Sequence, residues 1–125
     1  MEINEVTGGI IDAAMKVHRA LGPGLLESAY EACLIYELST RGLNVAAQVP
    51  LPIIYEEVRL EAGYRLDLVV QDAVVVEIKA VETVLPIHKA QLLSYLKLSQ
   101  HTVGLLINFN VELLKQGVTR LVNNL

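Results

Sequence analysis

Two short runs with the pattern of β-strands, joined by a three-residue loop, restrict the fold of this chain most strongly. The runs are Tyr64–Val70 and Val74–Lys79, and the loop is Gln71–Ala73. Such runs around a short loop are typical of a β-hairpin. Because the residues that flank the loop face each other, Val70 pairs with Val74 and every later pair follows from that register. The sequence therefore predicts an antiparallel hairpin with a defined pairing.

This register gives the two faces of the hairpin opposite characters. One face is apolar, and the other places Asp67 directly opposite Glu77. Opposed carboxylates repel each other, whereas a divalent cation such as Mg²⁺ between them would turn the repulsion into binding. Lys79, on the same face, would orient or deprotonate an attacking water, or neutralise charge on a phosphate. The apolar pairs are Leu66–Ile78, Leu68–Val76 and Val70–Val74, and Arg65 lies opposite Lys79.

A polar, solvated sheet face is the other interpretation of the same residues. Arg65 and Lys79 would then simply balance the charges of Asp67 and Glu77. Glu-x-Lys is common on exposed strands, so the hairpin alone does not separate a metal site from a solvated face.

The rest of the chain predicts helices and strands around this hairpin. Without a linker or an internal repeat, we expect a single domain over residues 1–125. The order α-α-β-β-β-β-α-β with a tail predicts an α/β or α+β sandwich. The expected segments outside the hairpin are helices at 3–21, 25–41 and 86–99, strands at 44–49, 53–60 and 103–109, and a tail with a turn at 112–116 and a strand at 118–122.

Composition excludes several classes of protein. Hydrophobic residues make up 53% of the chain and charged residues 19%, which excludes intrinsic disorder. No stretch free of charged residues is longer than 14 residues, and a membrane-spanning helix needs about 20. The first residues lack the pattern of a signal peptide. A single cysteine fits a reducing compartment, so we expect a cytoplasmic location.

The charge balance argues against a free-standing nucleic-acid binder. The chain has 10 basic and 14 acidic residues and a net charge of −4, with no basic run. Affinity for phosphate comes from clustered Lys and Arg. The high apolar content indicates surface left over for a homodimer or a partner protein.

Two helical features add candidate residues. Gln91 and Tyr95 are four residues apart, so they share one face of the predicted helix and can bind a phosphate or a metal-bound water. An ordinary polar helix face explains them equally well. Glu27 lies in the first turn of the second helix, where a carboxylate also complements the helix dipole.

Gly24, Glu27 and Tyr30 form the pattern GxxExxY. With its surroundings, this pattern resembles the signature of a family of small bacterial and archaeal proteins named after it. The resemblance covers nearly the whole chain and includes His18–Gly24, Asp67, Glu77–Lys79, Gln91 with Tyr95, and Gly104–Phe109.

The resemblance implies a fold and a site. The family is placed in the PD-(D/E)xK nuclease-like superfamily, which implies a restriction-endonuclease-like core with a mixed β-sheet flanked by helices around a Mg²⁺ site. Leu66 stands where the superfamily name has proline. By this resemblance Asp67 and Glu77 would be metal ligands, Lys79 the catalytic lysine, Glu27 an added helical acid that completes the metal site, and Gln91 with Tyr95 the pair that follows the main motif.

We therefore expect a Mg²⁺-dependent nuclease that hydrolyses nucleic acid, with DNA as the expected substrate and Mn²⁺ as a substitute metal. A metal-activated water would attack the phosphodiester. Two alternatives stay open. One is a nuclease-like binding or assembly module without catalysis, and the other is a metal-dependent hydrolase of another phosphate ester.

Overall fold

The computed structural model describes residues 1–61 and 63–124. The helices and strands lie close to the ranges expected from sequence. They are α1 (Ile3–Leu21), α2 (Glu27–Thr40), β1 (Val45–Pro50), β2 (Ile53–Tyr55), β3 (Val58–Leu60), β4 (Arg65–Val70), β5 (Val74–Lys79), α3 (Pro86–Ser99), β6 (Val103–Asn108), the 3₁₀ turn η1 (Leu114–Gly117) and β7 (Val118–Val122).

The main sheet is mixed and has the strand order β1-β4-β5-β6-β7. β5 and β6 are parallel, and the other neighbours are antiparallel. Parallel neighbours need a crossover connection, which α3 supplies between β5 and β6. The predicted α/β fold, a mixed sheet flanked by helices, is therefore confirmed.

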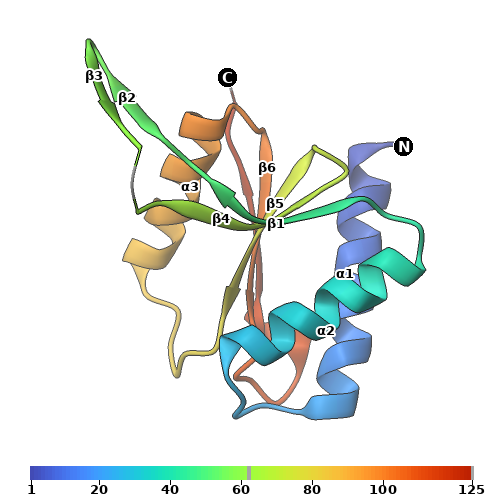
Figure 1. Ribbon diagram of the computed structural model, residues 1–125. Helices are drawn as coiled ribbons and strands as arrows, with labels where there is room; N and C mark the ends of the chain where they lie inside the picture. The colour runs from blue at the N-terminus through green and yellow to red at the C-terminus, as the bar shows by residue number, and fades with distance from the viewer. Residues whose placement is uncertain (62, 125) are drawn as a thin grey trace.

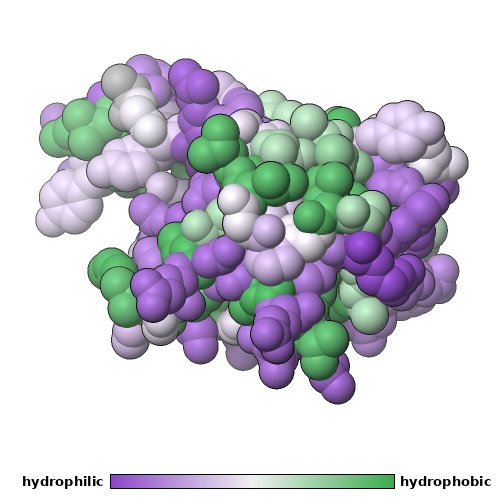
Figure 2. Space-filling model, turned by 90° about the horizontal axis from the view of Figure 1, so that it is seen from below, coloured by the Kyte–Doolittle hydropathy of each residue, from purple (hydrophilic) through white to green (hydrophobic). Residues whose placement is uncertain are grey.

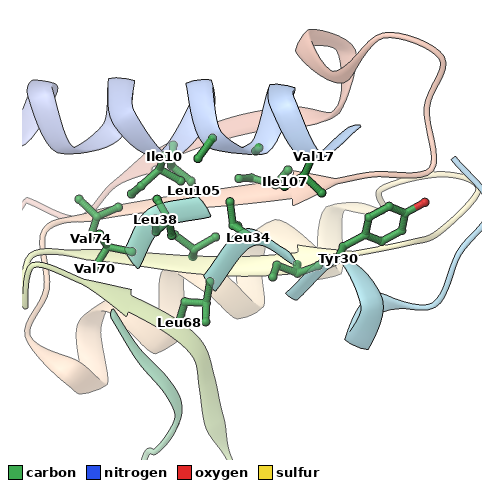
Figure 3. Packing of buried hydrophobic residues seen from close by; sticks show 14 of the residues in the cluster. Ile10, Val17, Tyr30, Leu34, Leu38, Leu68, Val70, Val74, Leu105 and Ile107 are labelled. Carbon is green, nitrogen blue, oxygen red and sulfur yellow. The ribbon is translucent and has the colours of Figure 1, made fainter. Parts of the chain in front are cut away.

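Helices cover both faces of this sheet (Figure 1). α1 and α2 lie on one face, where their apolar side chains pack against alternate residues of β4, β5 and β6. Figure 3 shows this packing, with Ile10 and Val17 of α1 and Leu34 and Leu38 of α2 in one layer with Leu105 and Ile107 of β6. Among the described residues, no helix is both long enough and apolar enough to span a membrane.

α3 covers the opposite face. Its buried residues Leu92 and Leu96 pack against Val69, Val75 and Leu106. Gly104 of β6 lies directly beneath the helix, because a Cβ at this position would come within 3.2 Å of both leucine side chains. The close approach of α3 thus depends on a residue without a side chain.

The prediction of one continuous strand over residues 53–60 is wrong. The segment folds into two short strands, β2 and β3, which form a separate two-stranded sheet and leave the main sheet between β1 and β4. The chain reverses between the two strands at Glu56 and Glu57, where Glu56 has a φ of +52°. We call residues 53–60 the arm.

The central hairpin has the predicted register near its loop. Val70 pairs with Val74, Val69 with Val75, and Leu68 with Val76. Beyond Leu68 the ladder between β4 and β5 stops, so the predicted direct pairing of Asp67 with Glu77 does not form. β4 keeps its pairing with β1 as far as Pro50–Arg65 and therefore turns away from β5.

This separation also corrects the predicted apolar face. Leu66 packs with Val69 and Val75 on the α3 side, whereas Leu68 and Val70 pack on the side of α1 and α2. A strand that twists sharply at one residue no longer keeps strict alternation of its faces. Asp67 is the residue at which the change occurs.

Candidate active site

Asp67 and Glu77 lie together where β4 and β5 separate. The Asp67 N–H donates a hydrogen bond of 3.2 Å to Glu77 Oε1, and the Ile78 N–H donates one of 2.8 Å to Asp67 Oδ2. Each carboxylate thus accepts a hydrogen bond from the opposite strand at the point where the ladder ends. The expected meeting of the two acids is present, although through side chains rather than through a ladder pair.

Glu77 is held in an unfavourable environment for a charge. Its side chain is almost fully enclosed, with 6% of the residue exposed. Burial, and then the negative charge of Asp67, raise the pKa of Glu77 from 4.5 to about 8, although Lys79 opposes the shift. A bound cation would relieve both causes, because it replaces the lost hydration and offsets the second carboxylate.

Lys79 lies at the end of β5, two residues beyond Glu77, and is half-buried. Its positive charge acts on Glu77 in the direction that favours the carboxylate. In the described part of the chain, Lys79 forms no ion pair within 4.0 Å. Its ammonium group is therefore available to a substrate or a water beside the two acids.

Glu27 reaches the same region from the start of α2. Its Oε2 accepts a hydrogen bond of 3.3 Å from the N–H of Ala80, the residue after Lys79. Glu27 and Asp67 line one pocket of about 250 Å³. No three metal-binding acids, histidines or cysteines converge within residues 1–61 and 63–124, so the role of Glu27 as a ligand stays a prediction.

The acid pair nevertheless suits a hard divalent cation. Mg²⁺ often binds through one or two carboxylates and completes its shell with waters and substrate oxygens. Asp67 and Glu77 provide two neighbouring carboxyl groups. Glu77 is the buried one, and its burial raises its pKa and so favours the protonated form. Asp67 and Glu77 are thus the residues that fit the metal implied by the resemblance.

The charges of the two acids act on Tyr95 of α3. Burial and the nearby charges of Glu77 and Asp67 raise the pKa of the Tyr95 hydroxyl, and Tyr64 adds to the shift. The Tyr64 and Tyr95 rings meet edge to face with centroids 6.3 Å apart. Gln91 is exposed on α3, one turn away, and its role stays a prediction.

Protein-family models identify the superfamily. Residues 4–121 match the model described as the PD-(D/E)XK nuclease superfamily. The chain belongs to this superfamily. No curated protein and no solved structure matches the chain. The narrower resemblance to the GxxExxY family stays a prediction.

Membership of the PD-(D/E)XK superfamily indicates a nuclease-like function and explains the placement of the acids. The residues that the sequence predicts for the superfamily pattern lie on neighbouring strands, Asp67 on β4 and Glu77-Ile78-Lys79 on β5, and their roles stay a prediction. Leu66 replaces the proline of the pattern and packs into the core beneath α3.

Tyr30, the last residue of the GxxExxY pattern, fixes the loop that precedes Glu27. Its hydroxyl donates a hydrogen bond of 2.6 Å to Gly22 O and accepts one of 3.1 Å from the Leu25 N–H. The Tyr30 ring stacks on Phe109 at 4.5 Å. The tyrosine therefore positions the start of α2.

Two polar residues of this pocket, Glu31 and Gln48, were not predicted from the sequence. Glu31 accepts a hydrogen bond of 2.7 Å from Gln48 Nε2, and both side chains line the pocket shared by Glu27 and Asp67. The spacing of Glu27 and Glu31, four residues apart on one helix face, was an available signal. Gln48 gave no signal in the sequence, because its position depends on the conformation of β1, in which its φ is +52°.

Asn108 also holds the site, from the end of β6. Its Nδ2 donates to Val81 O at 2.9 Å, and its Oδ1 accepts from the N–H groups of Val81 and Asn110 at 3.1 and 3.2 Å. Asn108 is buried and lies beside Lys79 in the parallel ladder. It therefore anchors the segment that follows the lysine.

Proposed function

We propose that this protein hydrolyses phosphodiester bonds in nucleic acid, with DNA as the expected substrate and Mg²⁺ as the metal. Mn²⁺ is expected to substitute. The observation that carries the proposal is the contact of half-buried Asp67 with buried Glu77, two residues before Lys79, at the separation of β4 and β5. The superfamily match supports a nuclease-like function in general.

Each of these residues has a distinct task in the proposal. A bound divalent ion would supply an activated water and stabilise charge on the phosphate. Asp67 and Glu77 hold that ion, and Lys79 orients the water or interacts with a phosphate oxygen. Glu27, fixed by its contact with the Ala80 N–H, completes the acidic side of the pocket.

The aromatic pair would orient the substrate. Tyr95 feels the charges of the acids, and Tyr64, which contacts it edge to face, is exposed. A phenol hydroxyl can donate a hydrogen bond to a phosphate oxygen, and an exposed ring can stack on a base. Gln91, one helical turn from Tyr95, would add a second polar contact.

Hydrolysis of labelled single-stranded and double-stranded DNA and of RNA, with Mg²⁺ or Mn²⁺, tests the proposal. Loss of a metal ligand or of the lysine should lower the rate by about 100-fold or more, whereas loss of an exposed charge elsewhere should not. Equal rates in all variants would contradict the assignment. The site variants are Glu77→Gln and Lys79→Ala, and the matched controls are Glu5→Gln and Arg41→Ala.

A non-catalytic binding module is the second candidate, and one observation favours it. Glu27 and Glu31 line the pocket beside Asp67, so the field around the site repels a phosphate that arrives without a cation. Mg²⁺ should raise the melting temperature of a metal site by mass action. No shift at millimolar Mg²⁺, together with no hydrolysis, would favour the module.

Hydrolysis of a different phosphate ester is the remaining alternative from the sequence. The same acids and lysine would serve it, because the chemistry at phosphorus is shared. A screen of small phosphodiesters and phosphomonoesters beside the nucleic acids would separate the two. Faster turnover of a small ester, abolished by Lys79→Ala, would replace nucleic acid as the substrate.

A further inference from the structure

The arm exposes one apolar face. Ile53 pairs with Leu60 and Tyr55 with Val58, so these four side chains lie on the same face of the two-stranded sheet. The exposed fractions of Tyr55, Val58 and Leu60 are 71%, 53% and 53%. Figure 2 shows the arm as a lobe at the left of the molecule, where green and pale side chains stand clear of the body.

An isolated two-stranded hairpin is at best marginally stable in water. β2 and β3 pair with each other and, among the described strands, with no other. A hairpin of this kind gains stability when its apolar face packs against another surface. The arm therefore has the properties of an element that is covered in the functional state.

A groove of about 670 Å³ lies beside the base of the arm. Its walls come from β1, from Leu51 and Pro52 after that strand, from β4 and from the end of α3, and Ile54 of the arm forms its rim. The groove shares no residue with the pocket lined by Glu27 and Asp67. Most of the lining is apolar, with Asp72 and His101 at its polar part. The apolar lining includes Ala46, Val49, Leu51, Leu66 and Leu98.

We propose that two copies of this chain form a dimer in which the arm of each copy lies in the groove of the other. A projection and a hollow next to each other on one molecule are what a two-fold symmetric contact requires, because each surface meets its complement on the second copy. A second copy is thus the occupant that this surface fits.

The contact between arm and groove is apolar rather than ionic. Among the described residues, the groove is lined by no lysine or arginine, and its charged residue is Asp72, which lies 3.6 Å from His101. Residues 53–61 carry Glu56, Glu57 and Glu61 against a single arginine. This acidic segment would repel the phosphates of a nucleic acid, so a protein surface fits it better.

The apolar area is sufficient for a stable contact. Covering the apolar side chains of one arm removes roughly 400 Å² from water, since a buried aromatic side chain alone accounts for about 150–250 Å². Two arms and the two grooves that they cover would bury on the order of 1,600 Å², the size of a standard interface. The dimer does not depend on the proposed nuclease activity.

The oligomeric state, measured by light scattering and sedimentation without substrate or metal, tests the dimer. The wild type should be a dimer at micromolar concentration. Apolar-to-polar changes in the arm, and a charge placed in the groove, should each raise the dissociation constant at least about tenfold, and an exposed aromatic elsewhere should not. The variants are Val58→Thr with Leu60→Thr in the arm, Ala46→Glu in the groove, and Tyr36→Gln as the control.

Circular dichroism of each variant distinguishes lost association from lost folding, because a folded monomer is the result expected of the arm and groove variants. A monomeric wild type would overturn the proposal and leave the arm to another protein. So would a dimer that the arm and groove variants affect no more than Tyr36→Gln does.

A cross-link locates the contact. In a Cys33→Ser background, chains with Val58→Cys are mixed with chains that carry Ala46→Cys. Disulfide-linked mixed dimers are expected if the arm enters the groove. Links between two Val58→Cys chains in place of the mixed link would show arm-to-arm packing and overturn the groove assignment.

Discussion

The backbone N–H of Asp67 donates a hydrogen bond of 3.2 Å to Oε1 of Glu77, at the point where β4 and β5 stop pairing. This contact joins the two acids that carry the proposed chemistry and leaves one of them buried. A fold that placed the same acids on a solvated face would not change the pKa of either in this way. The raised pKa of Glu77 should make the stability of the protein depend on pH, which can be measured.

Stability should fall as the pH rises, because Glu77 keeps its proton in the folded state. Its pKa is raised from 4.5 to about 8. Below pH 4.5 both states are protonated, between these values the unfolded chain ionises first, and above pH 8 the full cost is present. The loss should be on the order of 5 kcal/mol. Urea unfolding with a chelator across this range, compared with Glu77→Gln, measures it. Parallel pH profiles for the two proteins would contradict the prediction.

Metal binding should release a proton. At pH 6–7 Glu77 is mostly protonated, and a cation that binds its carboxylate displaces that proton. Titration calorimetry with Mn²⁺ in buffers of different ionisation enthalpy should show about one proton released. Glu27→Gln should weaken binding and keep the release, whereas Glu77→Gln should abolish it. Binding with no proton release in the wild type would count against Glu77 as a ligand.

Tyr30→Phe should weaken both the fold and the site. The variant keeps the stack on Phe109 and loses the hydroxyl that bonds Gly22 O and the Leu25 N–H. Two unsatisfied groups should lower the free energy of unfolding by about 1–3 kcal/mol. Urea denaturation gives this value, and hydrolysis measured well below the melting temperature reports the position of Glu27. Unchanged hydrolysis in the folded variant would mean that the loop does not position the acid.

Asn108→Ala should destabilise the segment after Lys79. The buried amide makes three hydrogen bonds to the backbone of Val81 and Asn110, and its loss should cost about 2–3 kcal/mol. Asn110→Ala is the matched control, because the described hydrogen bonds of Asn110 come from its backbone. Hydrogen exchange at residues 80–82 should increase in the first variant only. Equal exchange in both would remove Asn108 from the support of the site.

Much of the site could be predicted from the sequence. The loop at Gln71–Ala73 is local, so the pairs nearest to it follow from strand geometry, and the meeting of Asp67 with Glu77 follows from them. Helix bounds were predicted to within two residues because apolar periodicity is also local. The approach of Glu27 and Tyr95 came from the resemblance, since it depends on segments far apart in the chain.

Other features had no local signal. The arm leaves the sheet because β4 pairs with β1 in its place, and the change of face at Leu66 follows from the twist of that pair. Tyr64 meets Tyr95 only after α3 packs on the sheet. Each of these outcomes depends on which side chains become buried when distant segments of the chain pack together.

The local pattern of residues 64–79 is enough to pair Val70 with Val74 and Leu68 with Val76, and so to bring Asp67 and Glu77 onto neighbouring strands. The separation of β4 and β5 at those acids, the burial of Glu77 and the position of the arm outside the sheet arise only in the folded chain. The physical reason is the distance along the chain between the residues that set each property. Alternation is set by the geometry of consecutive residues, whereas burial and its effect on a charge are set by side chains that arrive from α2, α3 and β6.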